Sequence, residues 1–107
     1  MDTALKALAE PRRRQILKLV WTDELAASHI AAHFGDVTRP AISQHLGVLR
    51  QADLVLERRD GVRRLYRANV AEVQRVRQYL EEYWTESLQR LRQVAETAER
   101  EKGLTHG

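Results

Sequence analysis

The sequence predicts a mainly α-helical domain that carries one β-hairpin and ends in a long helix. Apolar residues recur three or four positions apart over most of the chain, which is the spacing of one face of an α-helix. Over residues 54–68 the pattern changes to alternation around Asp60-Gly61, a dipeptide typical of tight hairpin turns. From residue 70 the helical spacing returns and continues for about eight turns.

Composition limits the class of protein. A chain of 107 residues is enough for one domain with an ordinary apolar core. Because it has no cysteine, it can form no disulfide, no thiolate metal site and no cysteine nucleophile. The N-terminus lacks the regions of a signal peptide, and no apolar run approaches the length of a membrane span. We therefore expect a cytoplasmic protein without a membrane partner.

The positive charge is concentrated in the first two thirds of the chain. Residues 1–68 carry twelve Lys and Arg against eight Asp and Glu, which gives 12 − 8 = +4, whereas residues 69–107 carry six against seven, which gives −1. Such an asymmetry favours a polyanionic partner for the first part. The alternative is that the excess charge only solvates the surface.

Three short helices are expected before residue 35. They are residues 3–8, Pro11 to about Trp21 with the proline at its first position, and roughly Glu24 to Phe34 with Gly35 as a left-handed C-cap. Arg12 to Arg14 crowd the first turn of the second helix, where the helix dipole disfavours cations. This placement suits either a nearby phosphate or carboxylate, or merely an exposed surface.

Residues 38–51 predict a helix with one apolar and one polar side. Ile42, Leu46 and Leu49 share the apolar side, and Thr38 is a plausible N-cap. Gln and Ser can contact base edges, Arg can bind guanine or phosphate, and a glycine allows a close approach. The alternative is an ordinary surface helix. The polar side carries Pro40, Ser43, Gln44, Gly47, Arg50 and Gln51.

The helix at 24–34, the tight turn Gly35-Asp36-Val37 and the helix at 38–51 form a predicted helix-turn-helix, with the second helix in the DNA-reading position.

The hairpin over 54–68 is expected to be basic and to turn at Asp60-Gly61. Five arginines against two acids lie between Glu57 and Arg67, which suits a hairpin that contacts phosphate. Edge strands can also carry charge only to resist aggregation. With that turn, the facing pairs would be Val55–Tyr66, Leu56–Leu65, Glu57–Arg64 and Arg58–Arg63, the last of which is unfavourable without an anion nearby.

A final helix from Val70 to about Arg100, capped by Asn69, carries an apolar stripe longer than a small domain can cover. The simplest partner for it is the same helix of a second subunit. A helix folded back on its own domain would use only the first part of the stripe. The stripe comprises Val73, Val76, Leu80, Trp84, Leu88, Leu91, Ala95 and Ala98, widened by Tyr79 and Tyr83.

The segments ALAEPRRRQILKLV, HIAAHFGDVTRPAISQHLGVLRQADLV and ERRDGVRRLYRAN resemble the arsenic-repressor-like (ArsR/SmtB) family of bacterial transcriptional repressors over roughly residues 4–84. The resemblance implies a winged helix-turn-helix of order ααααββα that pairs as a homodimer through its terminal helices. It also implies binding to an imperfectly palindromic DNA operator.

We accordingly expect one domain over residues 1–100, with a DNA-binding core at 3–68 that includes the wing at 54–68. A dimerisation helix at 69–100 and a flexible tail at 101–107 would follow.

The resemblance and the residue patterns together assign three sets of residues. The recognition helix would bind DNA through Thr38, Arg39, Pro40, Ser43, Gln44, His45 and Arg50. The wing would contact phosphate through Arg58, Arg59, Arg63 and Arg64. The dimer interface would include Leu5, Leu8, Val73, Val76, Leu80, Tyr83, Trp84, Leu88 and Leu91.

The metal sites of the resembling family are not expected in this chain. The family's cysteine pair falls on Ala26 and Ser28, and the final helix has no histidine before the tail. His29 and His33 are four apart, a spacing that can hold a divalent ion, but they make only half a site that Asp23, Glu24 or Asp36 would have to complete. We expect no metal and no cofactor. An unknown small molecule is still possible as an effector.

Three rival functions fit the sequence less well. An enzyme is disfavoured because Ser43 and His45, two apart on one helix, point in nearly opposite directions and no carboxylate is placed to orient the histidine. A winged helix that binds only protein would need an apolar outer side on 38–51. A metal-responsive derepressor would have to use His29 and His33. We therefore expect a dimeric DNA-binding repressor that is metal-independent or regulates its own promoter.

Overall fold

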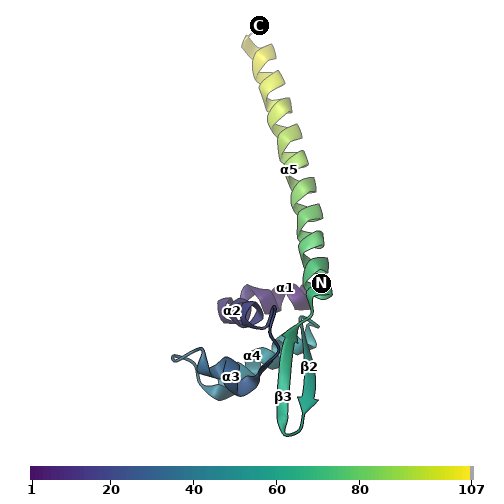
Figure 1. Cartoon of the computed structure of the whole chain (residues 1–107). Coiled ribbons are helices and arrows are strands. Elements are labelled where there is room, and N and C mark those ends of the chain that lie inside the picture. The colour runs from purple at the N-terminus through teal and green to yellow at the C-terminus, as the bar shows by residue number, and fades with distance from the viewer. Residues whose placement is uncertain (107) are drawn as a thin grey trace. The chain divides into compact units, whose positions relative to one another are not determined.

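The computed structural model describes residues 1–106, and the side chains of residues 1–103 (Figure 1). Within these residues the chain forms two compact units. The first is Met1–Val76, and the second begins at Arg77. The elements are α1 (Asp2–Ala9), α2 (Pro11–Leu19), β1 (Leu25–Ala26), α3 (Ala27–Ala32), α4 (Arg39–Gln51), β2 (Val55–Asp60), β3 (Arg63–Ala68) and α5 (Val70–His106).

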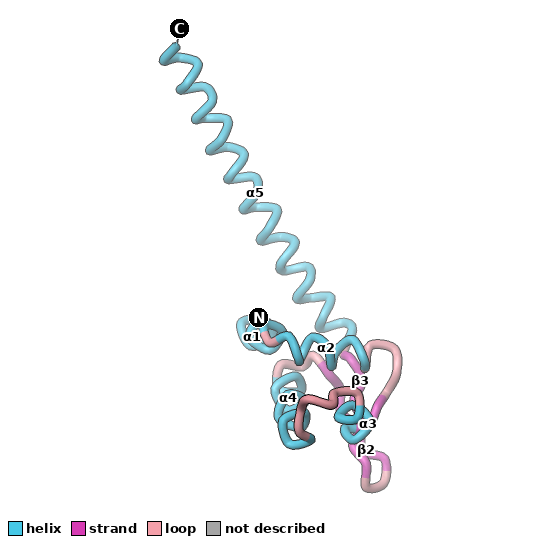
Figure 2. The backbone as a smooth tube through the Cα atoms, turned by 90° about the vertical axis from the view of Figure 1, so that its left-hand side faces the viewer, coloured by secondary structure: helices cyan, strands magenta, loops and turns pink. Residues whose placement is uncertain are grey.

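The first unit is built around α4, which packs against α1, α2, α3 and β2 (Figure 2). Ile42, Leu46 and Leu49 of α4 are fully buried, as their spacing predicted. Apolar side chains from every helix of the unit and from the hairpin complete one core, and no polar side chain is buried among the described residues. Its largest fully buried members are Ile16, Ile30, Ile42, Leu46, Leu49, Leu54, Val20, Val55 and Val76.

The ends of the short helices follow local hydrogen-bonding chemistry. Thr38 is the N-cap of α4 as expected, since the Ala41 N–H donates to its Oγ1 at 3.2 Å. The expectation that Gly35 caps α3 in a left-handed conformation was wrong. The N–H groups of His33 and Phe34 bond to carbonyls three residues back, at 3.1 Å each, so the helix closes in a 3₁₀ turn and needs no left-handed residue.

A short strand stands where the sequence predicted the start of a helix. Leu25 and Ala26 form β1 and pair antiparallel with Tyr66 and Leu65, so the sheet order is β1-β3-β2. The predicted helix at 24–34 therefore begins only at Ala27. Two residues are too few to show alternation, and alanine favours helix, which explains the error.

The hairpin turn lies one residue later than predicted. Asp60 pairs with Arg63, so Gly61 and Val62 are the turn residues, and Gly61 has a φ of 64°. The predicted type I′ turn would require a positive φ at both Asp60 and Gly61. A type II′ turn over Gly61 and Val62 requires it only at Gly61, where a glycine adopts it without strain. All four predicted pairs were wrong. The observed ones include Glu57–Tyr66, Arg58–Leu65 and, as the facing like charges, Arg59–Arg64.

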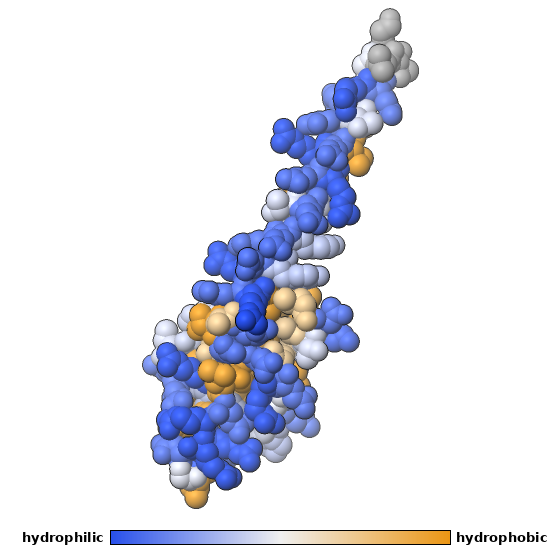
Figure 3. Space-filling view, turned by 90° about the vertical axis from the view of Figure 1, so that its right-hand side faces the viewer, coloured by the Kyte–Doolittle hydropathy of each residue, from blue (hydrophilic) through white to orange (hydrophobic). Residues whose placement is uncertain are grey.

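The second unit is a continuous helix whose apolar side chains are exposed. Leu80, Trp84 and Leu91 are 45%, 63% and 63% exposed. In the view of Figure 3, apolar residues group on the first unit and mainly polar residues cover the long helix. No helix among the described residues is long and apolar enough to cross a membrane.

Helix α5 continues to His106, past the end expected near Arg100. Gly107, the last residue of the predicted tail, lies outside the described residues, and the tail's flexibility stays a prediction.

Candidate nucleic-acid interface

An open groove of about 500 Å³ lies between α4, the start of α3 and the β2–β3 hairpin. Its lining combines several guanidinium groups with small and polar side chains and only one carboxylate among the residues that form it, Glu57. A concave surface with this excess of cations attracts an anionic chain. The cations are Arg39, Arg50, Arg63 and Arg64, and the other lining residues are Ala26, Ala27, Ser28, Ser43, Gly47, Val62 and Tyr66.

One side of α4 supplies the floor of this groove. Ser43 and Gly47 lie one helical turn apart and both line it, while Arg39 and Arg50 stand near the two ends of the helix. Gln44 is exposed and, with Gly47, lines a second hollow of about 420 Å³ on the other side of the helix. The polar side predicted from the sequence is therefore solvent-facing, and it borders two hollows.

Gly47 is not required by packing within the chain. A Cβ built at this position would meet no atom within 4 Å, and the residue has no positive φ. Glycine in a helix interior costs about 1 kcal/mol relative to alanine. The residue thus destabilises α4 without an internal reason, which fits a helix surface that another molecule approaches closely.

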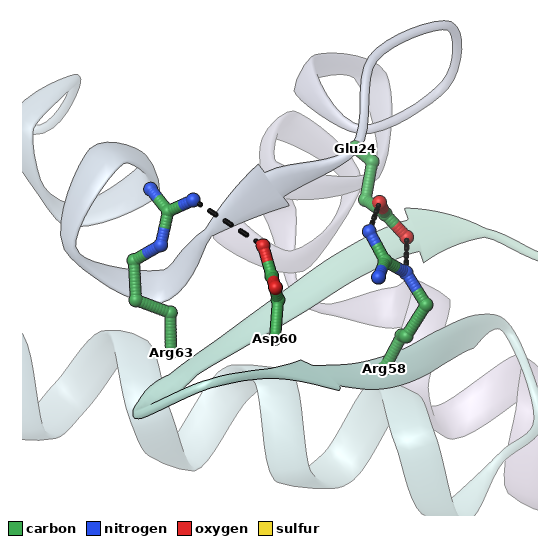
Figure 4. A network of polar contacts seen from close by, with 4 residues as sticks. All are labelled: Glu24, Arg58, Asp60 and Arg63. Carbon is green, nitrogen blue, oxygen red and sulfur yellow. Dashed lines mark hydrogen bonds and ion pairs between the residues drawn. The ribbon is translucent and has the colours of Figure 1, made fainter.

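Three of the hairpin arginines lie in ion pairs, and Figure 4 shows those of Arg58 and Arg63. Arg58 donates two hydrogen bonds to the Glu24 carboxylate, at 3.1 and 2.5 Å. These bonds lower the pKa of the Glu24 carboxyl below its ordinary value and raise that of Arg58. Nearer the turn, Arg63 lies 3.6 Å from Asp60. Exposed pairs of this kind are weak in water, so a phosphate can replace the carboxylate.

Of the other arginines, Arg50 and Arg64 lie beside Glu57, whereas Arg59 has no carboxylate partner among the described residues. Arg50 and Arg64 lie 3.5 and 3.8 Å from the two oxygens of Glu57, which joins α4 to the hairpin across the groove. Arg59 forms no ion pair with any residue that the structure describes. Burial raises the pKa of the Tyr66 hydroxyl, with Glu57 nearby as a further cause, so this lining residue stays a neutral hydrogen-bond donor.

The comparisons with known proteins agree with this geometry. Residues 10–56, which contain α2 to α4, match the family described as "Bacterial regulatory protein, arsR family". The HTH-type transcriptional regulator Rv2034 of Mycobacterium tuberculosis is 39% identical over 87 residues, which cover 81% of this chain and 80% of that protein. This chain belongs to the arsR family.

Further relatives and solved structures extend the match. The transcriptional repressor SdpR of Bacillus subtilis is 36% identical over 69% of this chain and 81% of its own length. An ArsR-like transcriptional regulator from Rhodococcus sp. RHA1 superposes with a TM-score of 0.81 at 31% identity, covering 92% of this chain and 89% of that one.

The homodimeric winged helix-turn-helix DNA-binding domain Mb0332 from Mycobacterium bovis has a TM-score of 0.63 at 34% identity, over 76% of this chain and 77% of that one. The predicted winged helix-turn-helix fold is confirmed. The protein is a transcriptional regulator with a DNA-binding helix-turn-helix and, as its relatives are regulators, not an enzyme.

In this arsR-family protein the arginines at the start of α2 have partners inside the chain. Arg12 donates to Asp36 at 2.6 Å, and its guanidinium lies 4.8 Å from the centre of the Phe34 ring. Arg13 donates to the carbonyls of residues 7 and 6, at 2.6 and 3.2 Å, and Arg14 to those of residues 8 and 9, at 2.7 and 3.1 Å. The guanidinium groups of Arg13 and Arg14 therefore cap the C-terminus of α1 and are not left unpaired for a phosphate.

His45 lies away from the main groove. Its side chain is half-buried, and its Nδ1 is 3.4 Å from a terminal nitrogen of Arg13. The contact connects α4 to the cation that caps α1. The sequence assigned His45 to DNA and gave no sign of this neighbour, because the two residues are far apart in the chain.

The weak metal candidates are exposed and are not gathered into a site. Among the described residues there is no group of three His, Cys, Asp or Glu that could hold a metal ion. His29 and His33 are both exposed. Two of the carboxylates that would have to join them are already bonded to arginines, Asp36 to Arg12 and Glu24 to Arg58.

The residues predicted for a dimer interface differ in exposure. Val76 is only 2% exposed and belongs to the core of the first unit. Leu5, Leu8 and Val73 are partly buried against that core. The other predicted members are exposed: Leu80, Tyr83, Trp84, Leu88 and Leu91.

The sequence reasoning missed Trp21. This residue is 37% exposed and lines a hollow of about 480 Å³ with Leu8 and Leu17, bordered by Arg14 and Lys18. A large aromatic residue just after an amphipathic helix was the available signal.

Proposed function

We propose that this arsR-family protein is a repressor that binds double-stranded DNA as a homodimer at a pseudo-palindromic operator. The basic groove between α4 and the hairpin is the observation that carries the proposal, because four arginines line it and its floor is polar and free of bulky side chains. The repressor role is supported by the relative SdpR, and the homodimer by the solved domain Mb0332.

The exposed side of α4 would enter the major groove. Ser43 and Gln44 would read base edges, since hydroxyl and amide groups match their donor and acceptor pattern. Arg39 and Arg50, at opposite ends of the helix, would bind guanine or phosphate. Thr38 and Pro40 fix the start of the helix and would lie beside the backbone, and His45 would contribute from the side where it meets Arg13.

The hairpin would bind the backbone beside the major groove. Arg63 and Arg64 line the common groove, and Arg59 has no carboxylate partner among the described residues. Arg58 would have to exchange two hydrogen bonds to Glu24 for a phosphate, so its contribution should be smaller than that of Arg59. Each phosphate bound in this way releases counterions and makes the affinity salt-dependent.

Repression would not need a metal ion. The carboxylates nearest in sequence to the two exposed histidines are held by arginines, and two imidazoles alone bind a divalent ion poorly. Because these histidines and carboxylates do not form a metal site, we expect repression to be controlled through the protein's own promoter or by a small-molecule effector.

Fluorescence anisotropy tests the proposal with the full-length protein on a duplex from its own upstream region and on a scrambled duplex. It should be run at two salt concentrations, with and without zinc. Selective binding with two subunits per duplex, steep salt dependence and no effect of zinc would support a metal-independent, self-regulating repressor. Equal and weak binding to both duplexes would contradict the self-regulating form, and release by zinc would contradict metal independence.

A further inference from the structure

The hollow beside Trp21 has apolar walls and lies apart from the basic groove. Leu8 of α1, Leu17 of α2 and Trp21 form these walls, and none of them lines either hollow beside α4. Its volume of about 480 Å³ lies within the usual range of small-molecule sites, about 300–1,000 Å³. Because Trp21 is half-uncovered and does not belong to the core, its ring offers a flat apolar surface to another molecule.

The rim of this hollow carries charge of one sign. Arg14 and Lys18 border it, and they are four residues apart on α2, so they lie one turn apart on the same side of the helix. Like charges at this spacing destabilise a helix slightly. None of the residues that form the hollow is acidic. An anion placed between the two cations would therefore relieve their repulsion and complement the rim.

Lys18 is available to such an anion. Its side chain is exposed, and its ammonium group forms no hydrogen bond or ion pair with any residue that the structure describes. The Arg14 guanidinium donates to the carbonyls of residues 8 and 9, at 2.7 and 3.1 Å. Hydrogen bonds from a guanidinium to a carboxylate are stronger than those to a neutral carbonyl. A carboxylate beside Lys18 would therefore compete with the end of α1 for Arg14.

The end of α1 connects this hollow to α4. Arg13, the residue before Arg14, donates to the carbonyls of residues 7 and 6 and lies 3.4 Å from His45 of α4. Helix α1 also packs directly against α2 and α4. A ligand that takes Arg14 from the α1 carbonyls would therefore loosen one of the supports of α4.

We propose that this hollow binds a small organic anion, with a flat apolar body and one carboxylate, and that the bound anion lowers the affinity of α4 for DNA. The apolar body would lie against Trp21 between the two leucines, and the carboxylate would lie between Lys18 and Arg14. The effect on DNA rests on the proposed function, for which it gives the small-molecule effector a site and a chemical class.

Isothermal titration calorimetry of the full-length protein tests the chemistry of the ligand, with 2-naphthoate and its neutral analogue 2-naphthamide as probes. The two probes have the same shape and differ in charge. We expect naphthamide to bind at least about tenfold more weakly, because it cannot form charge-assisted bonds to the rim. Equal affinities would overturn the anion. Failure of naphthoate to bind the dimeric protein would overturn the site and leave a second copy as the occupant of the hollow.

The position of the probe is tested by the two tryptophan indole N–H signals in NMR spectra. Naphthoate should shift the Trp21 signal, which is assigned by its loss in Trp21→Phe, and leave that of Trp84 unchanged. Lys18→Gln should raise the dissociation constant of naphthoate about tenfold. Lys6→Gln is the matched control, because Lys6 is also an exposed helical lysine but does not line the hollow. A shift of Trp84 alone, or equal weakening by the control, would overturn the site.

Fluorescence anisotropy with a specific duplex tests the effect on DNA. Saturating naphthoate should raise the dissociation constant of the duplex at least about fivefold, and by linkage the duplex should raise that of naphthoate by the same factor. Unchanged DNA affinity would overturn the effector role. Naphthoate binding at Trp21 by a protein that shows no selective DNA binding would reject the repressor and leave the anion site standing.

Discussion

Replacing Gly47 with alanine should stabilise the first unit and weaken its binding to DNA. The residue lies inside α4, has no positive φ, and a Cβ there would meet no atom of the chain within 4 Å. The substitution should therefore gain the helix-propensity difference, about 1 kcal/mol. For a unit of this size that gain would raise the thermal midpoint by roughly 4–8 °C.

The same methyl group would project into the groove that is proposed to hold DNA. An added methyl group in a close-packed interface typically costs about 1–3 kcal/mol. We therefore expect the affinity of Gly47→Ala for a specific duplex to fall at least about tenfold, the equivalent of about 1.4 kcal/mol.

Thermal unfolding followed by circular dichroism, with anisotropy on the same preparation, measures both effects. Gly103→Ala is the matched control, because Gly103 also lies in a helix with open space around its Cβ position but is remote in sequence from α4. The control should leave DNA affinity unchanged. A stabilised Gly47→Ala protein that binds DNA as tightly as the natural one would refute the close approach of DNA to this position.

Three further substitutions test single contacts. Gln44→Ala should reduce discrimination between operator and scrambled duplex by about 1–3 kcal/mol while leaving non-specific affinity unchanged; equal losses on both duplexes would remove Gln44 from base reading. Arg63→Ala should weaken all duplexes alike and flatten the salt dependence by about one unit; an altered sequence preference with the same slope would argue against a phosphate contact. Because hydrogen bonds from Arg58 lower the pKa of Glu24, any stability from this pair is present at neutral pH and is lost as pH falls through the lowered pKa. In an NMR titration the Glu24 midpoint should rise towards its ordinary value in Arg58→Gln; an unchanged midpoint would show that the pair does not form in solution.

The parts of the fold that depend on local chemistry could be predicted from the sequence. The burial of Ile42, Leu46 and Leu49 follows from helical spacing, and the cap at Thr38 follows from its hydroxyl and position. A hairpin around Gly61 was equally visible. The solvent-facing polar side of α4 was also predicted, because the residues that do not share the buried apolar side of a helix face away from the core.

The parts that depend on distant neighbours could not. Strand β1 exists because Leu25 and Ala26 meet the edge of β3, some forty residues later. The hairpin register depends on which turn residue must take a positive φ. The predicted and the observed register place every side chain on the same face of the sheet, so the apolar pattern could not distinguish them. Likewise, only the fold brings Arg13 to the end of α1 and to His45.

The most direct test of the central claim is to map the DNA-contacting residues by the amide chemical-shift changes of the full-length protein on a specific duplex. Changes concentrated in residues 38–51 of α4 and 58–64 of the hairpin, with little change around Trp21, are the expected result. Changes concentrated around Leu8, Leu17 and Trp21, with α4 unaffected, would contradict the account.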